Sequence, residues 1–87
     1  MRKPIARGDV IKVTWTDILE DSVSDPDKAQ PAVRISYGLF WAQEVRGPCE
    51  CLVTTTTLDA DNSSQSGYCI YPIGNVLKIE IVKRHRP

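Results

Sequence analysis

The clearest indication of the fold is the segment Tyr68-Cys-Ile-Tyr-Pro-Ile-Gly-Asn-Val-Leu-Lys-Ile-Glu-Ile-Val-Lys-Arg-His-Arg-Pro87. A short strand is predicted over 68–71, and the Pro-Ile-Gly-Asn segment after it has the composition of a tight corner. A second strand follows over 76–83, because Leu77, Ile79 and Ile81 alternate with the residues between them. A strand, a corner and an alternating strand are typical of the way small five-stranded barrels close.

Three more strands precede this ending. The first is predicted over 8–16, where Ile11, Val13 and Trp15 alternate with polar residues. The second covers 32–45, and its apolar face is expected to point to the core. That face consists of Val33, Ile35, Tyr37, Leu39, Trp41, Gln43 and Val45. Phe40 is then a large apolar side chain on the outer side, and Gly38 is a candidate site for a bend or bulge.

The third of these strands is predicted over 49–58, where four consecutive threonines favour extended backbone. A turn at 46–48 precedes it. The segment 59–67 is polar and lacks bulky residues, so it is expected to be a loop. The longest connection, 17–31, holds five acidic residues and two prolines and is expected to be a long acidic loop with an exposed tip.

These elements predict one all-β domain over 1–87, an SH3-like or Sm-like five-stranded small barrel with a long acidic first loop and basic tails at 1–7 and 84–87. The rival is the oligonucleotide-binding barrel, which usually has a helix between its third and fourth strands. The segment 59–67 is too short and too polar to form that helix.

Composition narrows the function classes. The chain of 87 residues has 11 basic and 11 acidic residues, whereas a dedicated nucleic-acid binder is usually basic. Nucleic acid is therefore not an expected partner. No apolar run approaches the roughly 20 residues of a membrane span, and no signal peptide is evident. Three cysteines, an odd number, suit a reducing compartment, so a cytoplasmic location without membrane attachment is expected.

No catalytic motif is present, and a domain of this size has little room for a buried reaction centre. Cys49, Cys51, Cys69 and His85 could in principle bind zinc. However, Cys-x-Cys on a strand brings two sulfurs to one metal less well than the Cys-x-x-Cys turn of structural zinc sites. We therefore expect free thiols that pack as small apolar groups, a histidine in a charged tail, no metal, no cofactor and no enzymatic activity.

The remaining candidates are binding residues. The hypothesis that ranks first is protein–protein contact, either with a second copy in a homo-oligomer or with another protein. Its apolar contacts are assigned to Phe40, Tyr68 and Tyr71, and its complementary charge to Asp17, Glu20, Asp21 and Asp25. Trp15, Tyr37 and Trp41 are expected to be core residues. The alternative is an anion or nucleotide site between subunits, formed by Arg2, Lys3, Arg7, Arg34, Lys83 and Arg84.

Two resemblances accompany these patterns. The segment 67–79 resembles the end of SH3 domains, in which Gly-Tyr-Ile-Pro leads through one turn of 3₁₀ helix into a Val-x-x-Ile strand. The peptide-binding signature of those domains is missing. In addition, 13–17, 33–39, 54–58 and 72–79 are similar to short uncharacterised proteins of bacteriophages and mobile elements. This second resemblance implies an accessory protein in the host cytoplasm that binds a host factor or sequesters a nucleotide.

Overall fold

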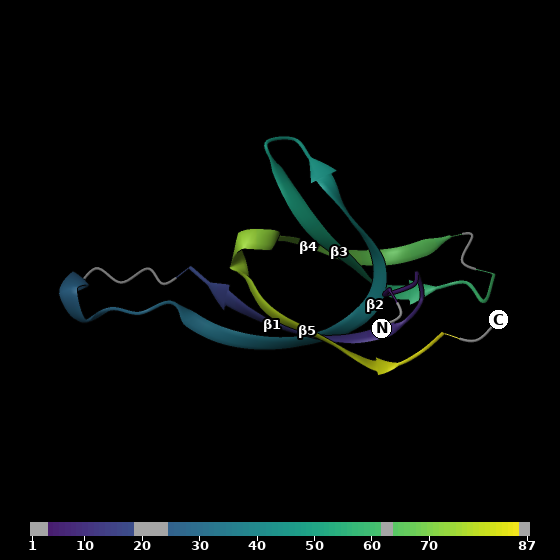
Figure 1. The fold of residues 1–87 in the computed structure, drawn as a ribbon, viewed down its shortest axis with the longest axis horizontal. Helices are drawn as coiled ribbons and strands as arrows, with labels where there is room; N and C mark the ends of the chain where they lie inside the picture. Colours follow the sequence, from purple (N-terminus) through teal and green to yellow (C-terminus); the bar gives the residue numbers. More distant parts are fainter. Residues whose placement is uncertain (1–3, 19–24, 62–63, 86–87) are drawn as a thin grey trace.

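The computed structural model describes residues 4–18, 25–61 and 64–85, and these form one antiparallel sheet of five strands (Figure 1). The strand order is β4-β3-β2-β1-β5. The elements are β1 (Val10–Asp17), β2 (Ala32–Arg46), β3 (Cys49–Leu58), β4 (Gln65–Pro72) and β5 (Val76–Lys83), with 3₁₀ turns η1 (Pro26–Lys28) and η2 (Ile73–Asn75). This confirms the predicted all-β class and the five strands. The described ranges contain no helix long and apolar enough to cross a membrane.

The predicted closure into a barrel is wrong. β4 and β5 stand at the two ends of the strand order, so the sheet keeps two edges. The reason lies at η2, which turns the chain away from β4. Asn75 Nδ2 donates to the Thr16 carbonyl oxygen at 3.0 Å, and Thr16 Oγ1 donates to the Asn75 carbonyl oxygen at 3.4 Å. These bonds hold the corner against the end of β1, and β5 then pairs with β1 instead of returning to β4.

Two loops differ from expectation. β4 begins at Gln65, inside the segment 59–67 predicted to be a loop, because Gln65 and Ser66 pair with Leu58 and Thr57 of β3. In the long connection between β1 and β2, the described residues include η1. The Asp25 side chain caps this turn by accepting from the Asp27 backbone N–H at 3.0 Å. η1 lies at the far left end of Figure 1, away from the rest of the sheet.

The core lies on one side of the sheet, and we call this side the inner face. Its buried members are Ile11, Val13, Leu52 and Tyr71. Partly buried side chains pack against them from the N-terminal segment, β1, β2, η2 and β5: Ile5, Trp15, Phe40, Ile73, Val76, Ile79 and Ile81. The Trp15 and Tyr71 rings meet edge to face, with centroids 5.4 Å apart. Each fully buried aliphatic side chain stabilises the fold by roughly 1.5–3 kcal/mol.

The prediction for the faces of β2 is wrong over 33–39, because the apolar side chains of this part of the strand lie on the outer face. Residues opposite each other in an antiparallel pair share a face. Val13 pairs with Ser36, and Ile11 pairs with Gly38. The buried side chains of β1 therefore set the small residues of β2 toward the core. Gly38 also lies directly against Thr54, whose Cβ would be 3.0 Å from a Cβ at position 38.

The irregularity of β2 lies beyond Gly38. The pairing of β2 with β3 shifts register between Phe40 and Ala42, with Trp41 as the extra residue. A bulge of this kind bends a strand and changes which side chains face the core. β2 accordingly curves along its length in Figure 1, joining β1 at one end and β3 at the other.

Asp9 joins the two ends of the described chain. Its carboxylate is 1% exposed and accepts from the His85 backbone N–H at 2.7 Å, the Ala6 backbone N–H at 2.9 Å and Arg84 Nη1 at 3.3 Å. Burial raises the pKa of this carboxyl. The two backbone hydrogen bonds and the positive charge of Arg84 outweigh burial, so the pKa lies below its ordinary value. Arg84 and His85, predicted to begin a basic tail, are thus held against the N-terminal segment.

Candidate functional site

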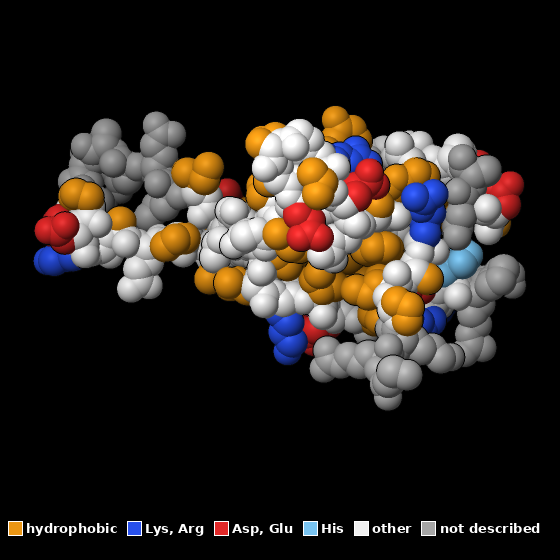
Figure 2. Space-filling view, turned by 45° about the horizontal axis from the view of Figure 1, so that its top comes forward, with side chains coloured by type: hydrophobic (Ala, Val, Ile, Leu, Met, Phe, Trp, Pro, Cys, Tyr) orange, Lys and Arg blue, Asp and Glu red, His pale blue; other side chains and the backbone are white. Residues whose placement is uncertain are grey.

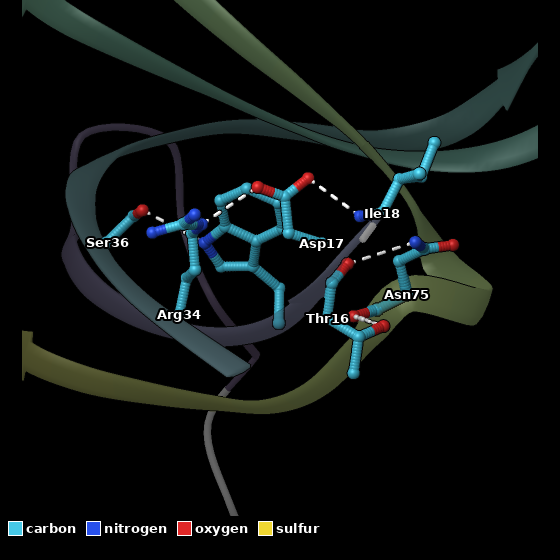
Figure 3. A network of polar contacts seen from close by, with 7 residues as sticks. Thr16, Asp17, Ile18, Arg34, Ser36 and Asn75 are labelled. Carbon is cyan, nitrogen blue, oxygen red and sulfur yellow. Dashed lines mark hydrogen bonds and ion pairs between the residues drawn. The ribbon is translucent and has the colours of Figure 1, made fainter. Parts of the chain in front are cut away.

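The acidic residues predicted to supply charge to a partner do not form one described patch. Asp17 Oδ2 accepts from Arg34 Nε at 2.8 Å, and Asp17 Oδ1 accepts from the Ile18 backbone N–H at 2.8 Å (Figure 3). The Arg34 hydrogen bond, followed by that from Ile18, lowers the pKa of the Asp17 carboxyl. Asp25 is an exposed cap of η1. Glu20 and Asp21 lie outside the described residues.

The basic residues of the alternative anion site do not converge either. Arg34 is paired with Asp17. Arg84 contacts Asp9 and donates to the Pro4 carbonyl oxygen at 2.8 Å. Arg7 lies over the Trp41 ring, with its Cζ 3.8 Å from the ring centroid, and donates from Nε to the Trp41 carbonyl oxygen at 3.0 Å. Lys83 is exposed on β5, and Arg2 and Lys3 lie outside the described residues.

The cysteines are free and divided between the two faces of the sheet. Cys49 and Cys51 lie two residues apart on β3, and their sulfur atoms are 3.6 Å apart. Cys69, on β4, is paired with Thr54 of β3 and lies on the inner face. Burial, followed by interaction with Cys49, raises the pKa of the Cys51 thiol, so this thiol is a poor nucleophile at neutral pH. Within 4–18, 25–61 and 64–85, no three His, Cys, Asp or Glu side chains are grouped so that they could hold a metal ion.

Of the three aromatic residues assigned to partner contacts, one is at the surface. Tyr68 is 68% exposed. One of Tyr68 and Tyr71 was expected outside, and it is Tyr68, because Tyr71 is 7% exposed and belongs to the core; Phe40, also expected outside, packs against that core. The physical reason is the same for both. β1 sets Gly38, and with it Phe40, toward the inner face, and Tyr71 pairs with the buried Leu52.

Three of the exposed apolar residues form a row on the outer face of β2. Val33 is 62% exposed, Ile35 56% and Tyr37 66%. We call these three residues the outer row. They were predicted to be core residues because they alternate regularly. The signal that could have corrected this is the small residue pair Ser36 and Gly38, which leaves room for the bulky side chains of β1 on the opposite face.

The outer face continues across β3 and β4 as an open hollow of about 340 Å³. Leu39, Thr55 and Tyr68 are paired across the three strands, and Thr55 is 2% exposed although it belongs to this face. The hollow is lined by Trp41, Arg46, Val53, Thr55, Gln65, Tyr68 and Ile70. Figure 2 shows one side of the molecule, on which hydrophobic side chains gather near the middle of the body, with charged side chains both beside and among them.

This arrangement can cover apolar surface of another molecule. Comparison of the chain with models of protein families, with curated proteins and with solved structures gave no match.

Proposed function

We propose that the protein is a non-enzymatic binding module that acts by contact with another protein chain through the outer face of its sheet. The observation that carries this proposal is the outer row. Val33, Ile35 and Tyr37 occupy three successive outward positions of one strand, and each is more than half exposed. Contiguous exposed apolar surface on a small soluble domain commonly marks an interaction site.

The fold class is part of the proposal. We infer an SH3-like architecture from the strand order, in which β1 lies between β2 and β5, and from the single 3₁₀ turn η2 that joins the last two strands. From the resemblance of four short segments to phage and mobile-element proteins, we also propose an accessory role in which the bound protein is a host factor or another copy of the chain.

An anion site between subunits receives less support. Arg34 and Arg84 each contact a carboxylate, and Arg7 covers an indole ring. A phosphate group would have to displace Asp17 or Asp9 to bind Arg34 or Arg84. Salt dependence separates the two functions, since binding through several phosphate contacts weakens steeply as salt is added and an apolar protein contact does not.

Site-specific photocrosslinking tests the proposal. Tyr37 is replaced by benzoylphenylalanine, which is similar in shape, and cells expressing this variant are irradiated. We expect a covalent adduct with a protein chain, identified by mass spectrometry as a second copy or a different protein. The matched control carries the same group at Leu77 of β5, which is 59% exposed. Equal labelling from both positions, or adduct formation abolished by moderate salt, would contradict contact through the outer row.

A further inference from the structure

The two edges of the sheet differ in a way that identifies one as an interaction site. An edge strand presents unpaired N–H and C=O groups, and proteins that must stay apart usually protect such strands with charges or bulges. β5 has this protection. It contains Lys78, Glu80 and Lys83, and its pairing with β1 has two register irregularities. Ile5 of the N-terminal segment also packs beside it.

β4 has none of these protections. Its sequence, Gln-Ser-Gly-Tyr-Cys-Ile-Tyr-Pro, carries no charged residue, and its only proline is the last residue. Every residue of β4 except Tyr71 is exposed. Its pairing with β3 is regular from Cys51 opposite Pro72 to Thr55 opposite Tyr68. An uncharged edge strand of this kind is suited to accept an additional strand, although Gly67 within it has a positive φ of 69°.

We propose that β4 pairs antiparallel with β4 of a second copy, joining the two sheets into one. The second copy is then one partner of the proposed protein-binding function, and the inference rests on that function. Self-pairing is favoured because a strand without charges meets no like-charge repulsion from its own copy. The symmetric register centred on Cys69 also places Tyr68 opposite Ile70 of the second copy, and Ile70 opposite its Tyr68. These are the two exposed apolar side chains of β4 on the outer face, 68% and 43% exposed.

The same register makes a geometric demand on Cys69. At the symmetry axis the residue lies directly opposite itself, where Cβ atoms of antiparallel strands are roughly 4.5–5.5 Å apart. That distance is close to the roughly 3.5–4.5 Å required for a disulfide. Gly67 is opposite Tyr71 of the second copy, so the residue of β4 that has no side chain faces the buried tyrosine.

Sedimentation velocity tests the pairing. The unmodified protein is expected to sediment as a dimer that dissociates on dilution. Ile70→Lys places an ammonium group at both symmetric positions of the interface and should weaken association by about tenfold or more. The matched control is Val82→Lys, which makes the same change at a 56% exposed position on β5 and should leave association unchanged. Circular dichroism establishes that both variants keep the β fold.

Crosslinking tests the register. In a Cys49→Ser, Cys51→Ala background only Cys69 remains, and diamide oxidises two thiols to one disulfide while taking up their two protons and two electrons. Covalent dimer should form from Cys69 roughly tenfold faster than from a cysteine introduced as Val82→Cys with Cys69 also removed, because pairing raises the local thiol concentration. Equal rates would refute the register.

The outcomes separate this inference from the proposed function. A protein that stays monomeric at its highest soluble concentration, or a dimer unaffected by Ile70→Lys, overturns self-pairing through β4. If Tyr37 still forms its protein adduct in that case, the binding function stands without this dimer. If the dimer forms as described but Tyr37 forms no adduct with any protein, the outer row is not the contact surface and β4 is.

Discussion

Asp9→Asn should destabilise the fold severely for a change of so few atoms. The carboxylate accepts three hydrogen bonds, from the His85 and Ala6 backbone N–H groups and from Arg84. An amide has one acceptor oxygen and adds two donors, so at least one backbone N–H loses its acceptor and Arg84 loses its ion pair with this carboxylate. Leaving a buried donor unpaired costs about 1–3 kcal/mol, more at charged groups, which gives about 2–4 kcal/mol in total.

Thermal unfolding followed by tryptophan fluorescence measures this loss. In a domain of this size about 1 kcal/mol corresponds to a shift of roughly 4–8 °C in Tm, so we expect a fall of about 10–30 °C at pH 7. The matched control is Asp25→Asn, the same chemical change at an exposed helix cap. Asparagine caps as well as aspartate, so this variant should unfold almost where the original protein does.

The pH dependence provides the decisive comparison for Asp9. Its folded-state pKa is depressed, so its stabilisation is complete above the unfolded-state pKa of about 3.9 and is lost as pH falls through the lower folded-state pKa. The stability gap between the original protein and Asp9→Asn should therefore narrow below about pH 4. A gap that is small at pH 7, or one that stays constant down to pH 2, would refute the role assigned to this carboxylate.

Two further substitutions test the assignment of faces. Phe40→Ala should lower the free energy of unfolding, measured in urea, by about 2–4 kcal/mol because Phe40 packs against the core. Tyr37→Ala on the outer row should change it by less than about 1 kcal/mol. The reverse order would support the original prediction of the faces. In Tyr71, burial raises the phenol pKa although hydrogen bonds with Ser36 and Thr54 lower it, so the unfolded chain ionises first and stability falls above about pH 10. Tyr71→Phe should therefore lose less of its free energy of unfolding than the original protein between pH 8 and pH 11, as measured by urea unfolding. An equal loss in the two proteins would count against this assignment.

Much of the strand pattern was readable from local sequence. Alternation at 11–15 and 77–81 and the turn residues at 46–48 and 72–75 correctly predicted where strands run and where the chain turns. The candidate site was less predictable. Alternation shows that one side of 33–37 is apolar, but it does not show which side the rest of the protein covers. The packing of Phe40 and Tyr71 depends on strands that are distant in sequence, which local periodicity does not report.

Local sequence is enough to predict five strands, because β-branched and aromatic residues at every second position favour extended backbone and turn residues interrupt it. The faces and edges of the sheet depend on tertiary contacts. Ile11 and Val13 are buried on the inner face, and Gly38 and Ser36 are paired with them. Val33, Ile35 and Tyr37 therefore lie on the outer face. The hydrogen bonds between Asn75 and Thr16 hold the η2 corner at the end of β1, so that β5 pairs with β1 and β4 is an edge strand. Both outcomes depend on contacts between residues far apart along the chain, and such contacts exist only once the sheet has formed.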